Sequence, residues 1–262
     1  CIRQAEKQKT AFISLEENKN YVSKKLFIAH HNNDENKSKY ENELLTLELK
    51  NYAYNEHKDT VNELFNRVMI FDTPDRIEPL EKLILATHER EQINIFFIDY
   101  IQRIYFQDTS YNKMTRQEQI KHINSRLLNL AKEHNIYIIM GAQMSRESVK
   151  DKKENWNVIC RDDIYREAGD IEQDANLIIN LWNTEKNKHT DKTEQFLYYI
   201  AKNRNGKPGG KYTSSIKLEY LQISLATPES KAETDKPGSK EKRKETLQTV
   251  SKTARKDFEG WK

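Results

Sequence analysis

The stretch "INIFFIDYIQ", residues 93–102, decides the fold, because it is apolar on both faces of a strand and ends at Asp99. A strand of this kind is typical of the centre of a parallel sheet that helices cover on both sides. Similar runs recur along the chain and are separated by longer helical patterns; they are "TAFISL" (10–15), "RVMIFD" (67–72), "NIYIIMGA" (135–142), "NLIINLW" (176–182) and "QFLYYIAKN" (195–203). This alternation predicts an α/β fold with a mostly parallel β-sheet flanked by helices.

Five helices are expected between these strands. Apolar spacing and start signals place them at residues 18–31, 37–50, 59–66, 77–91 and 115–135. The last strands, "YTSSIKLEYLQISL" (212–225), alternate between apolar and polar residues and predict an antiparallel hairpin at one edge.

Composition divides the chain into a folded domain at 1–226 and a basic tail at 227–262. The tail is rich in Lys, Glu, Ser, Thr and Pro and carries all of the net charge of +3. With so few apolar residues it cannot offset its ordering entropy, so we expect it to be disordered. Because the domain is neutral overall, a nucleic-acid site there has to be a local basic lining.

The lack of long apolar runs and the low cysteine content also exclude several classes of protein. The chain has no apolar run long enough to cross a bilayer and no secretory signal, so we expect a cytoplasmic protein without membrane contact. Cys1 and Cys160 have no metal-ligand spacing, which argues against a disulfide framework and structural zinc.

Three polar side chains follow predicted strands at the edge where α/β folds bind ligands. Asp99 can associate with Mg²⁺, Glu16 can orient and deprotonate a water, and Gln143 can hydrogen-bond a terminal phosphate. Each also has a structural alternative. Asp99 and Gln143 can simply begin loops, and Glu16 can belong to a helix start that Ser14 caps.

Lys202 and Arg204 lie two residues apart just before the glycine-rich turn "NGKPGG" (205–210). Residues two apart on an extended segment project to the same side, where two cations repel each other. The arrangement becomes useful when an anion with several oxygens, such as a polyphosphate, lies in front of both.

Taken in order, five motifs resemble the bacterial replicative DNA helicases, the DnaB-like family with a RecA-like motor domain. They are "FISLE" (12–16), "IDYIQ" (98–102), "AQMSR" (142–146), "REAGDIEQDAN" (166–176) and "AKNRNG" (201–206). The resemblance implies Glu16 as general base, Asp99 as the carboxylate that holds Mg²⁺ through water, and Gln143 as γ-phosphate sensor. It also implies that Lys202 and Arg204 serve the ATP bound by a neighbouring subunit.

The same resemblance implies contacts with single-stranded DNA. Arg166 would supply charge, while Glu167 and Gly169 would place backbone amides near the strand. Lys113 and Arg116, in the basic, polar loop "FQDTSYNKMTRQEQ" (106–119), are further candidates. A surface ion pair and an ordinary solvated loop are the alternatives.

The resemblance further implies a nucleoid-associated enzyme that uses ATP and Mg²⁺, forms a homo-oligomeric ring, a hexamer, and meets a primase or helicase loader. The phosphate-binding motif GxxxxGK[ST] does not occur in the sequence and is expected upstream of Cys1. We therefore expect this polypeptide alone to bind ATP poorly and to be inactive. A non-catalytic RecA-like module that assembles with a helicase ring is the alternative, and a different RecA-like ATPase is a third reading.

Overall fold

The computed structural model describes residues 8–32, 58–72, 75–144, 159–160, 169–183, 193–217, 222–224 and 227–228. Contacts between Cα atoms divide the chain into two units, Cys1–Pro228 and Glu229–Lys262. All described residues belong to the first unit. The predicted helix at 37–50 and the tail beyond Pro228 lie outside the described residues.

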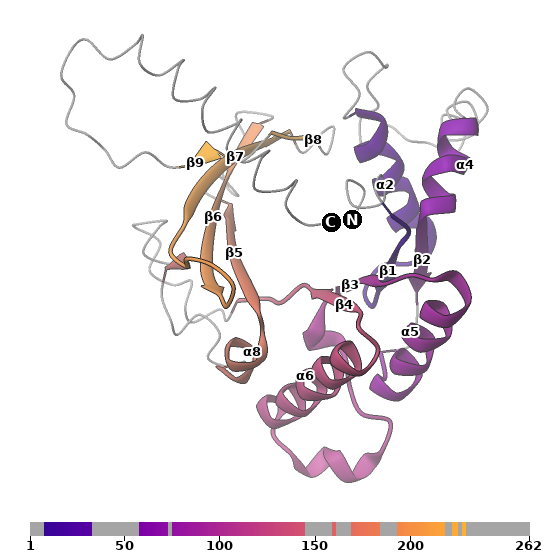
Figure 1. The fold of residues 1–262 in the computed structure, drawn as a ribbon, viewed down its shortest axis with the longest axis vertical. Helices are drawn as coiled ribbons and strands as arrows, with labels where there is room; N and C mark the ends of the chain where they lie inside the picture. The colour runs from indigo at the N-terminus through magenta and orange to yellow at the C-terminus, as the bar shows by residue number, and fades with distance from the viewer. Residues whose placement is uncertain are drawn as a thin grey trace, which may run out of the picture. The chain divides into compact units, whose positions relative to one another are not determined.

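A parallel sheet of four strands forms the centre of the fold, in the order β2-β1-β3-β4 (Figure 1). Its strands are β1 (Thr10–Ser14), β2 (Val68–Asp72), β3 (Ile95–Asp99) and β4 (Tyr137–Met140). Each coincides with a predicted apolar run. The mostly parallel α/β architecture is therefore confirmed.

Helices cover this sheet on both faces. The covering helices are α2 (Lys19–Asn32), α4 (Lys58–Arg67), α5 (Ile77–Glu91) and α6 (Arg116–Glu133), with the 3₁₀ turns η1 (Ile101–Arg103) and η2 (Thr109–Lys113) before α6. Side chains of α5 and α6 pack with Ala11 and Ile13 of β1, whereas those of α2 and α4 pack near Phe12 on the opposite face. The period-two alternation of β1 thus supplies both hydrophobic clusters.

Helix α6 begins with a complete capping box. The Thr115 hydroxyl accepts a hydrogen bond from the Glu118 amide, and the Glu118 carboxylate accepts one from the Thr115 amide. Buried Ile120, Ile123 and Leu127 then follow at helical spacing.

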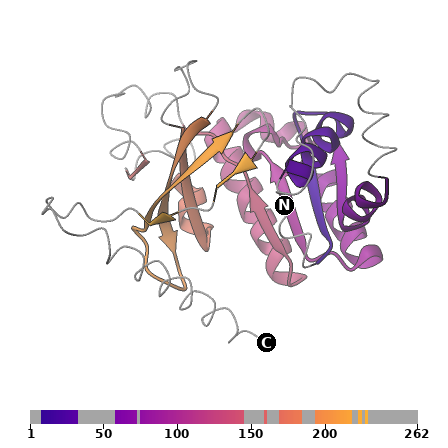
Figure 2. The same ribbon diagram turned by 90° about the horizontal axis from the view of Figure 1, so that it is seen from above.

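A second sheet is antiparallel throughout and follows the order β5-β6-β7-β8, with β9 paired to β7. Its strands are β5 (Leu177–Asn183), β6 (Thr193–Asn203), β7 (Lys211–Lys217), β8 (Gln222–Ile223) and β9 (Thr227–Pro228). The predicted hairpin of β7 and β8 is confirmed. The expectation that the runs at 176–182 and 195–203 join the parallel sheet is wrong, because these two strands pair with each other in antiparallel register (Figure 2).

A short helix, α8 (Gly169–Asp174), leads into β5 and contacts α6. The Asp174 carboxylate accepts hydrogen bonds from the Asn124 amide at 2.9 Å and the Ser125 hydroxyl at 3.4 Å. These bonds join the segment before β5 to the helical layer over the parallel sheet.

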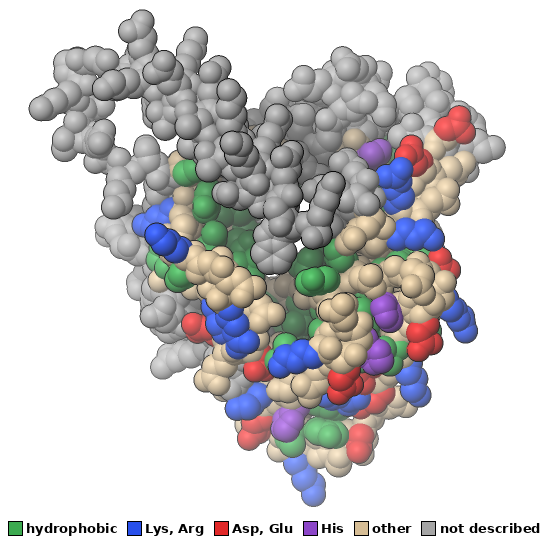
Figure 3. Space-filling model, viewed as in Figure 1, with side chains coloured by type: hydrophobic (Ala, Val, Ile, Leu, Met, Phe, Trp, Pro, Cys, Tyr) green, Lys and Arg blue, Asp and Glu red, His purple; other side chains and the backbone are tan. Residues whose placement is uncertain are grey.

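The face of the molecule drawn in Figure 3 intersperses Lys and Arg with Asp and Glu over α5 and α6. This mixture agrees with a domain whose basic and acidic residues balance. Within the described ranges, no helix is both long and apolar enough to span a bilayer.

Candidate functional site

The carboxyl ends of β1, β3 and β4 meet at one edge of the parallel sheet. Ser14 pairs with Asp99 in the ladder of β1 and β3, and Ile98 pairs with Met140 in that of β3 and β4. Glu16 follows β1, Asp99 ends β3 and Gln143 follows β4, and all three are exposed. The structure therefore brings these three predicted site residues to the same edge, while their chemical roles stay predictions.

Negative charge is concentrated around Asp99. Partial burial raises the pKa of the Asp99 carboxyl above its usual value, and the neighbouring carboxylates of Glu16 and Glu17 raise it further, while the Lys25 ammonium lowers it. Glu17 is paired with Lys25, whose Nζ lies 2.7 and 3.0 Å from the two carboxylate oxygens. Glu16 and Asp99 are thus close enough to repel, and a cation between them would relieve that repulsion.

The segment after β4 passes close to Asp99 because residue 141 is glycine. A Cβ atom at Gly141 would lie 3.3 Å from both the Asp99 Oδ1 and the Tyr100 Cβ. The backbone is held there by a hydrogen bond of 2.9 Å from the Gly141 amide to the Ile98 carbonyl. The close approach places the chain that carries Gln143 beside the Asp99 carboxylate.

The main chain of Gln143 is bound by the side chain of Gln102. The Gln102 Nε2 donates to the Gln143 carbonyl at 3.0 Å, and the Gln143 amide donates to the Gln102 Oε1 at 3.2 Å. Sequence reasoning assigns Gln102 no role, although it lies in the quoted "IDYIQ" motif. The contact spans 41 positions in sequence, so no local pattern indicates it.

Lys202, near the end of β6, and Arg204, directly after it, both reach the carboxyl-terminal end of α8. The Lys202 Nζ donates to the carbonyls of Glu172 and Gln173, the latter at 2.9 Å. The Arg204 Nη2 donates to the Gln173 carbonyl at 2.7 Å, and its Nη1 donates to the Asn176 Oδ1 at 3.3 Å. The two cations do share one side, as their spacing predicts, and within the chain they satisfy carbonyls at the end of a helix.

The predicted DNA contacts are described only in part. Arg166 and Glu167 lie outside the described residues, and Gly169 begins α8. Lys113 is exposed at the end of η2.

Arg116 has a structural role that its sequence context did not reveal. Its Nη2 donates to the carbonyls of Gln102 at 2.9 Å and Ile104 at 2.7 Å, and its guanidinium lies 4.3 Å from the centre of the Tyr105 ring. Burial lowers the pKa of this guanidinium below its usual value. Because these contacts engage Arg116 inside the domain, Lys113 is the better candidate for a phosphate contact.

The turn after β1 does not match the alternative in which Ser14 caps a helix start that contains Glu16. The Asn18 Oδ1 accepts the hydrogen bond from the Tyr21 amide in the first turn of α2, at 2.9 Å. The Ser14 hydroxyl accepts from the Glu17 amide instead, at 3.0 Å. Ser14 therefore stabilises the turn that carries Glu16, and Asn18 caps the helix.

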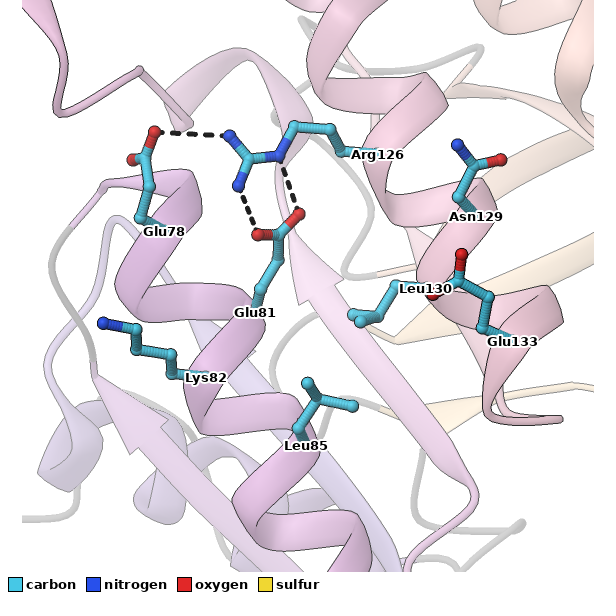
Figure 4. A pocket seen from close by; sticks show the side chains of 8 residues that line it. All are labelled: Glu78, Glu81, Lys82, Leu85, Arg126, Asn129, Leu130 and Glu133. Carbon is cyan, nitrogen blue, oxygen red and sulfur yellow. Dashed lines mark hydrogen bonds and ion pairs between the residues drawn. The ribbon is translucent and has the colours of Figure 1, made fainter.

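A groove between α5 and α6 is lined by Glu78, Glu81, Lys82, Leu85, Arg126, Asn129, Leu130 and Glu133 (Figure 4). The Arg126 guanidinium bridges the two helices, with hydrogen bonds to both oxygens of Glu81 and one of 3.3 Å to Glu78. The hydrogen bond to Glu81 is the largest of the effects that raise the pKa of Arg126. None of the predicted site residues lines this groove.

In the part of the chain that the structure describes, no group of three or more His, Cys, Asp or Glu residues is arranged to hold a metal ion. The oxygen donors of Glu16 and Asp99 do suit Mg²⁺, which proteins bind through one or two carboxylates together with water and substrate phosphates. The residues present at the sheet edge therefore fit a site of that open kind.

Several known proteins are similar to this chain. The family model "DnaB-like helicase C terminal domain" matches residues 1–223. The replicative DNA helicase DnaC of Bacillus subtilis is 30% identical over 157 residues, which cover 58% of this chain and 33% of that protein. The replicative DNA helicase DnaB of Geobacillus stearothermophilus is 31% identical over 157 residues, with the same shares of each chain.

Solved structures share the fold. One of them, an ATPase domain, superposes with a TM-score of 0.65 at 22% identity, covering 83% of this chain and 74% of that chain. A DnaB-like replicative helicase, solved in a study of its interactions with primase, gives a TM-score of 0.63 at 22% identity and covers 83% of this chain and 52% of that one.

This chain spans about a third of the length of the curated relatives it matches. The family model nevertheless matches most of its residues. The chain belongs to the DnaB-like helicase C-terminal domain family.

Proposed function

We propose that this chain is the motor portion of a replicative-type DNA helicase, which couples ATP hydrolysis to movement along single-stranded DNA and to duplex unwinding. The observation that carries the proposal is the gathering of Glu16, Asp99 and Gln143 at the carboxyl edge of one parallel sheet. Ligands of open α/β sheets bind at that edge.

Each of the three residues has a chemical role in the proposal. Glu16 is exposed at the sheet edge, where its carboxylate can accept a proton from a water that attacks the terminal phosphate. Asp99, with Glu16 beside it, would hold Mg²⁺ through water, and the ion would neutralise charge on the phosphates. Gln143 offers an uncharged amide that can hydrogen-bond the γ-phosphate.

Lys202 and Arg204 are proposed to serve the nucleotide of a neighbouring subunit in a homo-oligomeric ring, a hexamer. An arginine supplied across such a boundary is worth about 10³ to 10⁵ in rate. Both cations would then exchange the α8 carbonyls for phosphate oxygens. Arg166, Glu167, Gly169 and Lys113 are proposed to meet single-stranded DNA. A primase or loader as partner, and a place at the nucleoid, belong to the same proposal.

A pair of neighbouring carboxylates tests the hydrolytic role. ATPase activity is measured on the product of the complete reading frame that contains this chain, as wild type, Glu16→Gln and Glu17→Gln. Loss of the general base should lower kcat by about 10² to 10⁴, with ATP binding retained. Glu17→Gln removes the same charge one residue away; it breaks the Lys25 pair and removes one of the charges that act on Asp99, but it leaves the proposed base in place, so a much smaller effect is expected.

Equal rates in Glu16→Gln and wild type would refute the assigned base. Absence of both ATP binding and DNA-stimulated hydrolysis in that product would favour the alternative, a non-catalytic RecA-like module of a helicase ring. The role across the boundary is tested with Arg204→Ala, which should abolish most of the DNA-stimulated rate in the assembled ring.

A further inference from the structure

The ladder between β3 and β4 continues beyond the ends of both strands. The Gly141 amide donates to the Ile98 carbonyl at 2.9 Å, and the Ile101 amide donates to the Gly141 carbonyl at 3.0 Å. The next rung would join residue 143 to the segment after Ile101. At that position the backbone turns into the 3₁₀ helix η1, where the Arg103 and Ile104 amides donate to the carbonyls of Tyr100 and Ile101.

The Gln102 side chain supplies the missing rung. Its carboxamide combines an NH2 donor group with a carbonyl acceptor, and both contact one residue: Nε2 donates to the Gln143 carbonyl, and Oε1 accepts from the Gln143 amide. A strand partner makes the same two bonds with its backbone. One hydrogen bond engages the peptide unit before the Gln143 Cα atom and the other engages the peptide unit after it. Together they restrict the φ and ψ angles of Gln143, and therefore the direction of its side chain.

The main chain of Gln102 is itself held in place by neighbouring residues. Its carbonyl accepts the hydrogen bond of 2.9 Å from Arg116, and the preceding Ile101 is fully buried in the hydrophobic cluster. Arg116 in turn is half-buried against the Tyr105 ring. The position of Gln143 thus depends on the first turn of α6 through a continuous series of contacts.

We propose that Gln102 is the positioning residue for Gln143, holding its main chain so that the amide side chain points to the nucleotide edge of the sheet. This inference rests on the proposed function, because it assumes that Gln143 acts on a phosphate. Gln102 touches no reacting atom and acts only through Gln143. The 3₁₀ turn after Asp99 then has a structural role. It places the Gln102 side chain where the backbone of a continuing strand would otherwise bond the Gln143 main chain.

The first experiment tests the contact itself, on this chain and without nucleotide. Amide hydrogen exchange at Gln143 and Gly141 is followed by NMR in wild type, Gln102→Met and Gln102→Glu. Methionine keeps the shape and removes both bonds, so the Gln143 amide should exchange roughly 3- to 10-fold faster. Glutamate keeps the acceptor for that amide, so its exchange should stay near wild type.

The Gly141 amide is the internal control, because its acceptor is the Ile98 backbone. It should exchange at the same rate in all three proteins. The exposed Gln117→Met provides the same chemical change elsewhere and should leave both amides unaltered. Unchanged exchange of Gln143 in Gln102→Met would overturn the proposal.

The second experiment tests whether Gln102 acts through Gln143. ATPase rates of the product of the complete reading frame are compared for Gln102→Met, Gln143→Ala and the double variant. A positioning role predicts a lower kcat with the KM for ATP within about 2-fold, and a double variant no slower than Gln143→Ala alone. Additive losses in the double variant would overturn the proposal.

The two arms separate this inference from the function on which it rests. If Gln143→Ala hydrolyses ATP at the wild-type rate, or if the wild type hydrolyses none, the sensor role assigned to Gln143 fails. The exchange arm still decides in either case whether Gln102 holds the Gln143 main chain.

Discussion

Replacement of Lys202 by methionine should loosen helix α8. This helix has six residues, far fewer than an isolated helix needs in water, so contacts from outside must hold it. Lys202 donates to the Glu172 and Gln173 carbonyls, and Arg204 donates to the Gln173 carbonyl at 2.7 Å. Methionine keeps most of the length of the lysine and removes the charge and both donors.

The expected size follows from these contacts. A hydrogen bond from a charged group contributes about 1.5–3 kcal/mol when it is buried, and solvent reduces this at an exposed site. Lys202 is half-buried, so the two bonds together should stabilise α8 by about 1 kcal/mol, or about 5-fold in its local opening equilibrium. Arg204 remains in place and limits the loss.

Amide hydrogen exchange of Gln173 and Asp174, the last residues of α8, is the assay. Both should exchange about 5-fold faster in Lys202→Met than in wild type. Lys207→Met is the matched control, because Lys207 is exposed in the turn after β6 and carries the same charge. Equal exchange in wild type and Lys202→Met, or an equal change in the control, would refute the reasoning.

Two further predictions concern stability. Asp99→Asn should raise Tm by about 1–3 °C near neutral pH, because the raised pKa of Asp99 means that its ionised form opposes folding. The unfolding free energy of the wild type falls as pH rises from the unfolded pKa of 3.8 through the higher folded pKa. Calorimetry should therefore find that the gain in Tm shrinks toward about pH 4, and a gain independent of pH would contradict this cause. Arg126→Met should lower the unfolding free energy by about 1–2 kcal/mol in urea titrations, since Glu78 and Glu81 lose their shared partner. Lys82→Met, in the same groove, is the control. An equal loss of unfolding free energy in that variant would argue for a general charge effect.

Local sequence patterns predicted the parallel half of the fold well. Helix α5 begins and ends at the expected residues, Ile77 and Glu91, and α6 begins at Arg116, one residue after the expected start, with Thr115 as its cap. The strand ends of β1 and β3 then followed from the apolar runs, and with them the positions of Glu16 and Asp99. Periodicity sufficed here because each element buries its own apolar face.

The direction of strands β5 and β6 and the partners of individual side chains could not be predicted from the sequence. An apolar run such as "NLIINLW" reads the same in a parallel and an antiparallel sheet, so the pairing of β5 with β6 was missed. The contacts of Gln102, Arg116 and Lys202 join residues far apart in sequence, and each ends on a backbone carbonyl or amide that every residue possesses. No residue type marks such an acceptor, and only the folded chain reveals it.

The outer strands of the two sheets have a practical consequence for work with this polypeptide. Among the described strands, β4 pairs with β3 and β5 pairs with β6, and each is the last strand in the order of its sheet. Tyr137 and Ile139 on β4, and Leu177, Ile179 and Leu181 on β5, are 48–66% exposed. Apolar side chains that are exposed on the last strand of a sheet favour association with other chains, so samples at high concentration should self-associate and dilute ones should stay monodisperse longer.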